Sequence, residues 1–244
     1  MIFNLFKSRP TLSELIPKGF VDIHSHILPG IDDGAKNIKE SMELISEMKK
    51  LGFNKIIGTP HTYEGLYNNT NETIINSYNL LLKKLPENTN ISYASEYMLD
   101  VSLIEKAMDK TLLCIKENYV LIEMGFLYEP MNLFEIIFKI SLNGYIPVLA
   151  HPERYLFLHN DFNKYYELKD RNCKFQINLL SVTGGYGKNI LRVTEKLLKN
   201  KLVDFSGSDI HNLNHIAGIK KNNNIKIREI DRFENCLNNN LIFS

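Results

Sequence analysis

Phe20-Val-Asp-Ile-His-Ser-His26 is a mainly apolar run, rich in β-branched residues, that ends in a pair of histidines. Its composition predicts a buried strand over 20–24. Side chains two residues apart on an extended strand point to the same face. His24 and His26 would therefore project side by side from the end of this strand, as a pair of metal ligands does.

Similar short runs follow along the chain, and stretches with helical periodicity separate them. The predicted strands are 20–24, 54–58, 91–95, 118–123, 146–150, 174–178 and 202–206, and the predicted helices are 38–51, 71–85, 100–109, 131–143, 160–171 and 187–200. This alternation predicts an α/β fold with a parallel sheet covered by helices. A closed barrel of about seven strands is favoured over an open doubly wound sheet, because no glycine-rich phosphate loop follows the first strand.

The bulk composition limits the class of protein. No Pro/Gly/Ser-rich linker divides the 244 residues, so we predict a single domain over 1–244 with an N-terminal extension over 1–18. A formal net charge of +1 creates no overall field that would attract nucleic acid. No apolar run approaches the ~18 residues that span a bilayer, so no membrane insertion is expected. Three scattered cysteines without a C-x-x-C pair indicate a cytoplasmic protein.

Two parts of the chain are predicted to lie outside regular structure. The glycine-rich cluster 183–187 (TGGYG) is expected to form a flexible loop. The asparagine-rich segments 222–224 and 238–240 are expected in loops or a frayed end.

A set of histidines and carboxylates follows or ends the predicted strands. Its members are His24, His26, His61, Glu96, Glu123, His151, Asp209 and His211. In a βα barrel, the C-terminal ends of the strands carry the active site. Imidazole and carboxylate ligands without thiolate suit Mn, Fe or Zn. Eight such groups exceed the demand of one ion, so we predict two or three ions, with Glu96 and Asp209 as candidates for shared ligands.

Two further residues have alternative interpretations. Asp33, in the Asp-Asp-Gly sequence 32–34, is either part of a turn or a further metal ligand at the rim. Arg154, three residues after His151, is either a phosphate-binding residue or half of a surface ion pair with Glu153.

Several motifs together resemble the PHP (polymerase and histidinol phosphatase) superfamily. They are Asp22-Ile-His-Ser-His26, Leu28-Pro-Gly-Ile-Asp-Asp-Gly34, Thr59-Pro-His61, Glu96, Ala150-His-Pro-Glu-Arg154 and Ser208-Asp-Ile-His-Asn212. The combination is most similar to the branch of bacterial manganese-dependent protein tyrosine phosphatases from capsule and exopolysaccharide operons. The resemblance runs from about residue 20 to residue 235, in order.

This resemblance implies a distorted TIM-like (β/α)7 barrel with two or three metal ions, Mn first and Fe, Zn or Mg as alternatives. The implied ligands are His24, His26, Asp33, His61, Glu96, Glu123, His151, Asp209 and His211. We predict Arg154, His61 and Asp209 as catalytic residues, and Arg154 and His215 as substrate-binding residues. The implied reaction is metal-assisted hydrolysis of phosphotyrosine on the C-terminal tail of a bacterial tyrosine kinase.

One departure from the family pattern concerns phosphate binding. Members of this branch usually carry an arginine shortly after the Asp-x-His-Asn motif, whereas 213–218 (LNHIAG) has none and His215 is the nearest basic residue. Two alternatives to the tyrosine phosphatase stay open. One is a PHP phosphatase for a small phosphomonoester such as histidinol phosphate, and the other is an inactive barrel that serves as a binding module. The sequence leaves the oligomeric state open.

Overall fold

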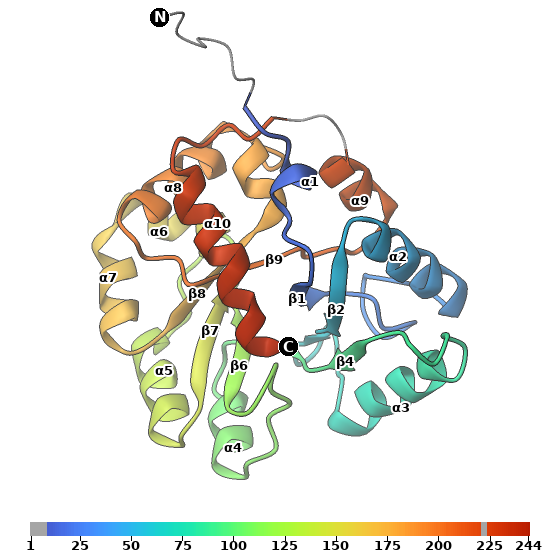
Figure 1. Cartoon of the computed structure of the whole chain (residues 1–244). Coiled ribbons are helices and arrows are strands. Elements are labelled where there is room, and N and C mark those ends of the chain that lie inside the picture. The colour runs from blue at the N-terminus through green and yellow to red at the C-terminus, as the bar shows by residue number, and fades with distance from the viewer. Residues whose placement is uncertain (1–8, 221–223) are drawn as a thin grey trace, which may run out of the picture.

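The computed structural model describes residues 9–220 and 224–244, in which parallel strands occupy the centre and helices surround them (Figure 1). The strands are β1 (Phe20–Ser25), β2 (Phe53–Gly58), β3 (His61–Thr62), β4 (Ile91–Tyr93), β5 (Glu96–Met98), β6 (Tyr119–Glu123), β7 (Ile146–Ala150), β8 (Lys174–Asn178) and β9 (Phe205–Gly207). All seven predicted strands are present, and β3 and β5 are two short strands that the sequence did not reveal.

Helices lie between the strands, as the periodicity predicted, and also before β1 and after β9, where none was predicted. They are α1 (Leu12–Leu15), α2 (Ile38–Lys50), α3 (Asn71–Leu82), α4 (Ser102–Met108), α5 (Leu133–Leu142), α6 (Leu156–Asn160), α7 (Asn163–Asp170), α8 (Lys188–Lys199), α9 (Leu213–Lys220) and α10 (Ile230–Asn239), with 3-10 turns η1 (Pro152–Arg154), η2 (Leu179–Thr183) and η3 (Asn240–Phe243). Within the described ranges, no helix combines the length and apolar character that a membrane crossing requires.

Hydrogen bonds divide the strands into two parallel sheets. One sheet has the order β1-β2-β4, and the other has the order β3-β5-β6-β7-β8-β9. The parallel α/β architecture is confirmed, but the described strands do not join into one closed sheet. The first sheet ends at the Gly58–Tyr93 pair and the second begins at the His61–Glu96 pair. Pro60 lies in this gap and has no N–H group for the ladder, so β4 ends at Tyr93, within the predicted strand 91–95, and β5 begins beyond it at Glu96.

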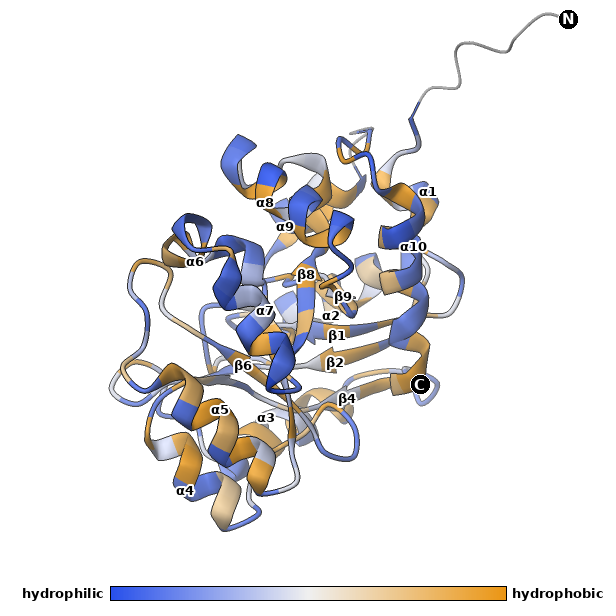
Figure 2. Cartoon of the chain, turned by 90° about the vertical axis from the view of Figure 1, so that its left-hand side faces the viewer, coloured by the Kyte–Doolittle hydropathy of each residue, from blue (hydrophilic) through white to orange (hydrophobic). Residues whose placement is uncertain are grey.

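The core has an inner part between the sheets and an outer part under the helices. Inward side chains of β1, β2, β6, β7 and β9 form one buried apolar cluster. Two larger clusters lie where the helices cover the strands. Figure 2 shows this distribution, with apolar strands inside and helices whose hydrophilic faces point outward. The inner cluster fills the space between the sheets. The buried histidines and carboxylates lie beyond it, mostly at the C-terminal ends of the strands.

The C-terminal segment corrects one prediction. Residues 238–240 do not form a frayed end: α10 continues to Asn239, and Asn240 is fully buried. The Asn240 amide donates to the carbonyl oxygens of Val21 (2.8 Å) and Ser206 (2.6 Å), and its oxygen accepts from the Ser206 N–H (3.2 Å). Asparagine is used here because it can donate and accept at once. Residues 222 and 223 of the other asparagine-rich segment lie outside the described residues.

The predicted loop 183–187 is also partly regular. Thr183 is buried and ends the 3-10 turn η2, and Gly184 caps that turn at a φ of 77°. This left-handed conformation suits glycine, which explains the residue there. Of the predicted N-terminal extension 1–18, residues 1–8 lie outside the described part. The remainder contacts the molecule, since Leu12 is fully buried and Arg9 donates to the carbonyl oxygen of Lys226 at 2.8 Å.

Candidate metal centre

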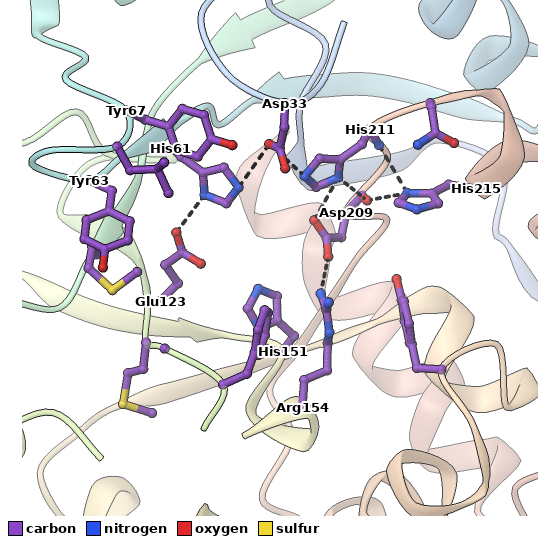
Figure 3. A pocket seen from close by; sticks show the side chains of 17 residues that line it. Asp33, His61, Tyr63, Tyr67, Glu123, His151, Arg154, Asp209, His211 and His215 are labelled. Carbon is purple, nitrogen blue, oxygen red and sulfur yellow. Dashed lines mark hydrogen bonds and ion pairs between the residues drawn. The ribbon is translucent and has the colours of Figure 1, made fainter. Parts of the chain in front are cut away.

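The structure brings all nine sequence-predicted ligands to one place, at the junction of the two sheets. Figure 3 shows those that line the cavity: Asp33, His61, Glu123, His151, Asp209 and His211. Their ligand atoms fall into four overlapping groups, each within 4.8 Å: His26, Asp33, His61 and His211; His24, His151 and Asp209; His24, His26 and Glu96; and His61, Glu96 and Glu123. The overlap means that single residues face more than one group. This is the arrangement that a cluster of several ions requires.

The histidine pair of β1 lies at the centre of this arrangement and is fully buried. The loop after β1 folds back closely over His26. A Cβ atom on Gly34 would lie only 2.2 Å from the His26 carbonyl oxygen, so no larger residue fits there. Gly207 permits a similar approach, since its Cβ atom would lie 2.7 Å from that of His24. Glycine at these two positions therefore allows neighbouring chain segments to close around the histidines.

Glu96 connects the groups from the break between the sheets. Its Oε2 atom lies 3.2 Å from Nε2 of His24, 3.4 Å from Nε2 of His26 and 3.1 Å from Nδ1 of His61. Its Oε1 atom lies 3.1 Å from Nε2 of His151. This geometry supports the prediction that Glu96 is shared between ions. The sequence placed Glu96 directly after a predicted strand. In the structure Glu96 is instead the first residue of β5.

The outer side of the cluster is built around Asp209. Its Oδ1 atom lies 3.3 Å from Nε2 of His24 and 3.4 Å from Nδ1 of His211. Asp33 is half exposed but lies within reach of His61 (3.4 Å) and His211 (3.5 Å). These contacts favour the ligand interpretation of Asp33 over a simple turn residue.

Backbone strain is concentrated at two of these residues. His151 has a φ of 36° and Asp209 a φ of 52°, the left-handed region that side chains with a Cβ atom rarely adopt. Each such residue costs on the order of 1–3 kcal/mol and persists only where its surroundings hold it. Here the N–H of His151 donates to the Gln176 carbonyl oxygen (2.7 Å), and that of Asp209 donates to the His24 carbonyl oxygen (2.8 Å). The neighbouring strands therefore hold both side chains toward the cluster.

The charges of the cluster depend on one another. Burial lowers the pKa of His24, but the Glu96 and Asp209 carboxylates outweigh it and raise the pKa. Burial and the neighbouring Glu96 carboxylate raise the pKa of Glu123 to about 7. Burial lowers the pKa of His151 to about 4. Imidazole cations and carboxylates thus compensate each other among side chains that are mostly buried.

The donor atoms fit divalent metal ions. The Nδ1–H groups of His24 and His26 donate outward, to Gln176 (2.7 Å) and Asp32 (2.8 Å). Their Nε2 atoms then face each other at 3.3 Å. At that distance a proton or a metal ion must lie between the two nitrogens, so a bound metal ion can replace the proton. Nδ1 of the buried His151 also has no hydrogen-bond partner among the described residues, which is rare for a buried polar atom.

An open cavity of about 510 Å³ leads from the surface to this cluster. It is lined by Asp33, His61, Tyr63, Leu66, Tyr67, Met98, Glu123, Met124, Gly125, Phe126, His151, Arg154, Tyr186, Asp209, His211, Asn212 and His215. Arg154 does not pair with Glu153, which is fully buried and accepts from the Ser181 hydroxyl at 2.6 Å. Instead its Nη1 atom donates to Oδ2 of Asp209 at 2.9 Å (Figure 3). The surface ion pair considered from the sequence is therefore excluded.

Residues 20–228 match the model of a family described as "Capsular polysaccharide synthesis, CpsB/CapC". The chain belongs to this CpsB/CapC family. It is 30% identical over 197 residues to the tyrosine-protein phosphatase YwqE of Bacillus subtilis, which covers 79% of this chain and 78% of YwqE. It is also 30% identical to the tyrosine-protein phosphatase CpsB of Streptococcus pneumoniae, over 79% and 83% of the two chains.

A solved structure supports the same relationship. It comes from work on YwqE and CpsB, described as unique metal-dependent tyrosine phosphatases, and superposes with a TM-score of 0.75 at 29% identity. The match covers 88% of this chain and 86% of the other.

In this CpsB/CapC member, residues that sequence reasoning missed hold the predicted ligands in place. Gln176 accepts from His24 and donates to Asn178 (3.0 Å), and Asn178 donates to Oδ2 of Asp209 (2.6 Å). Asp32 accepts from His26. The Asp-Asp-Gly sequence was a signal for Asp32, but nothing in the local sequence distinguishes the amides of β8. His215 does line the cavity, where its Nδ1 atom lies 3.0 Å from the Asp209 carbonyl oxygen.

Proposed function

We infer that this CpsB/CapC family member is a metal-dependent phosphomonoester hydrolase that acts on phosphotyrosine in proteins. The observation that carries this inference is the convergence of nine imidazole and carboxylate groups at the base of an open cavity with Arg154 beside them. The activities named for YwqE and CpsB support phosphotyrosine as the substrate.

The nine residues predicted from the sequence would hold two or three metal ions. We propose Mn²⁺, with Fe, Zn or Mg as alternatives, because the donors are nitrogen and oxygen only. Bound ions would supply positive charge and a water molecule of lowered pKa. His61 and Asp209 would act through this ligand set, and Gln176 and Asp32 would keep the Nε2 atoms of His24 and His26 free to bind.

The chain's own residues would bind and orient the substrate. Arg154 uses Nη1 on Asp209, so its other N–H groups remain for phosphoryl oxygens. His215 would contact the phosphoryl group or its surroundings from the α9 side. Apolar side chains on the cavity wall, among them Tyr63, Met98 and Met124, would cover the phenyl ring of phosphotyrosine.

We further propose the C-terminal tail of a bacterial tyrosine kinase, in the cytoplasm, as the physiological substrate. The capsular polysaccharide synthesis family supports a substrate in that system. We also propose that the two sheets form the wall of one distorted (β/α)7 barrel. A parallel bridge between Ser25, at the end of β1, and Ile210, after β9, supports this continuity.

The test is hydrolysis of a phosphotyrosine peptide by protein supplied with Mn²⁺. A chelator should abolish the activity, and thiol alkylation at neutral pH should leave it intact. Burial raises the pKa of the Cys173 thiol to about 12 and that of Cys114 to about 11, so neither is ionised at that pH. Loss of activity on alkylation with resistance to chelation would reject the proposal. Faster hydrolysis of histidinol phosphate than of the peptide would reject the substrate class alone.

A further inference from the structure

The guanidinium group of Arg154 packs against two aromatic rings. Its Cζ atom is 4.5 Å from the centroid of the Phe126 ring and 4.8 Å from that of the Tyr186 ring. Polar contacts hold the backbone of Phe126 and the side chain of Tyr186. The Phe126 carbonyl oxygen accepts from the N–H of Leu156 (3.0 Å), and the Tyr186 hydroxyl accepts from the Asn178 amide (3.4 Å). The rings come from the β6–α5 connection and from the segment before α8.

This arrangement restricts how an anion can reach Arg154. The two rings lie close to the guanidinium, and Asp209 already occupies one of its N–H groups, so an anion must approach the remaining N–H groups. Arg154 is also the only lysine or arginine among the described residues that line the cavity. A single flexible arginine would lose side-chain entropy on binding phosphate, whereas one held in its plane by aromatic contacts loses less.

We propose that Phe126 and Tyr186 are positioning residues, which fix the plane of Arg154 so that its free edge faces the phosphoryl group. This proposal rests on the proposed function only in naming a phosphoryl group as the ligand. A cation–π contact contributes roughly a 2- to 30-fold effect, which corresponds to about 0.5–2 kcal/mol at about 1.36 kcal/mol per factor of ten. Loss of one ring should therefore weaken phosphate binding within that range.

The experiment compares Phe126→Ala with Leu127→Ala in the metal-loaded protein. Phe126 is 40% exposed and Leu127 62% exposed, so both variants should fold, and only Phe126 lines the cavity. Calorimetry measures the Kd of inorganic phosphate, and kinetics measure KM and kcat for a phosphotyrosine peptide. We expect Phe126→Ala to raise Kd and KM by about 2- to 30-fold with a smaller change in kcat, and Leu127→Ala to change neither beyond about twofold. Phe126→Tyr should restore both constants.

The decisive comparison repeats Phe126→Ala in an Arg154→Ala background. If the ring acts through Arg154, it should add no more than about twofold there. An equal effect of Phe126→Ala in both backgrounds would overturn the proposal. An unchanged phosphate Kd together with a raised peptide KM would also overturn it, because the ring would then contact the phenyl group of the substrate. Tyr186→Ala should behave like Phe126→Ala, and Tyr186→Phe should keep the wild-type Kd. Phosphate binding is measured without turnover, so an inactive protein would reject the function and still test the positioning role.

Discussion

Single residues beside the ligands set the geometry of this centre. His26 can offer Nε2 to the cluster because its other nitrogen donates to Asp32, which also accepts from the N–H of Gly34 (2.9 Å). Burial opposes ionisation of Asp32, but the His26 charge outweighs it and lowers the pKa of this carboxyl. A charged acceptor fixes the tautomer of the imidazole more firmly than a neutral one does.

Asp32→Asn should therefore weaken metal binding without unfolding the protein. Replacement of an outer hydrogen-bond partner of a ligating histidine lowers metal affinity by about 10- to 100-fold. Titration with Mn²⁺ followed by calorimetry measures the change, and Glu43→Gln on the exposed side of α2 serves as a matched acidic control. Wild-type affinity in Asp32→Asn would contradict this role.

Metal affinity should also depend on pH in a definite direction. The pKa of His26 is raised, because Asp32, Asp209 and Glu96 overcome the opposing effect of burial, so the metal-free histidine holds a proton. The metal requires the neutral ring, so binding must release protons and the apparent affinity must rise with pH. Calorimetry in buffers of different ionisation enthalpy measures the proton release. No release, or weaker binding at higher pH, would contradict the expectation.

At the scale of elements, the side chain of Asn240 supplies hydrogen bonds to the backbone of both β1 and β9. The amide of Asn240, at the start of η3, joins β1 to β9 through Val21 and Ser206. β1 carries His24, and β9 directly precedes Asp209. Asn240 therefore stabilises the two strands that position these residues, at the end of the strands away from the cluster.

Asn240→Ala should lower the free energy of unfolding by about 1–3 kcal/mol, because buried backbone groups of Val21 and Ser206 would lose their partner. Denaturant titration measures the change. Asn238→Ala, at an exposed position two residues earlier, should leave stability within about 0.5 kcal/mol. Equal effects of the two substitutions would argue against the bridging role.

At the scale of the whole molecule, the end of the chain closes the inner core. Phe243 is fully buried, and its ring packs edge-on against Phe205 (4.9 Å between centroids) and Tyr119 (5.2 Å). Lys55 donates to its carbonyl oxygen at 2.7 Å. In Figure 1, the red helix α10 crosses in front of the strands and leads to this end.

Phe243→Ala should therefore destabilise the protein by about 3–5 kcal/mol, the usual range for removal of a buried aromatic ring. The neighbouring Ile242 is 49% exposed, and Ile242→Ala is the matched control, with little expected change. Thermal and denaturant unfolding measure both variants. A small effect of Phe243→Ala would show that the inner core does not depend on the C-terminal segment.

Most of the proposed ligands could be predicted from the sequence because each lies next to its own predicted strand, whereas Asp33 lies in the loop beyond β1 and the local sequence left it open between a turn and a ligand. A run such as 20–26 or 146–151 carries both the strand pattern and the histidine that follows it, and parallel strands end on the same side. Local periodicity likewise fixed the order of strands and helices.

Tertiary structure decided what no local pattern contains. The break between the sheets at Pro60, the support of His24 by Gln176 and the burial of Phe243 all involve segments distant in sequence. The same is true of Arg154, whose partner is Asp209 and not the adjacent Glu153. The sequence by itself was enough to nominate the candidate metal ligands, since most of them lie at strand ends that local periodicity marks. How they are oriented and enclosed depends on long-range packing, which only the folded chain defines.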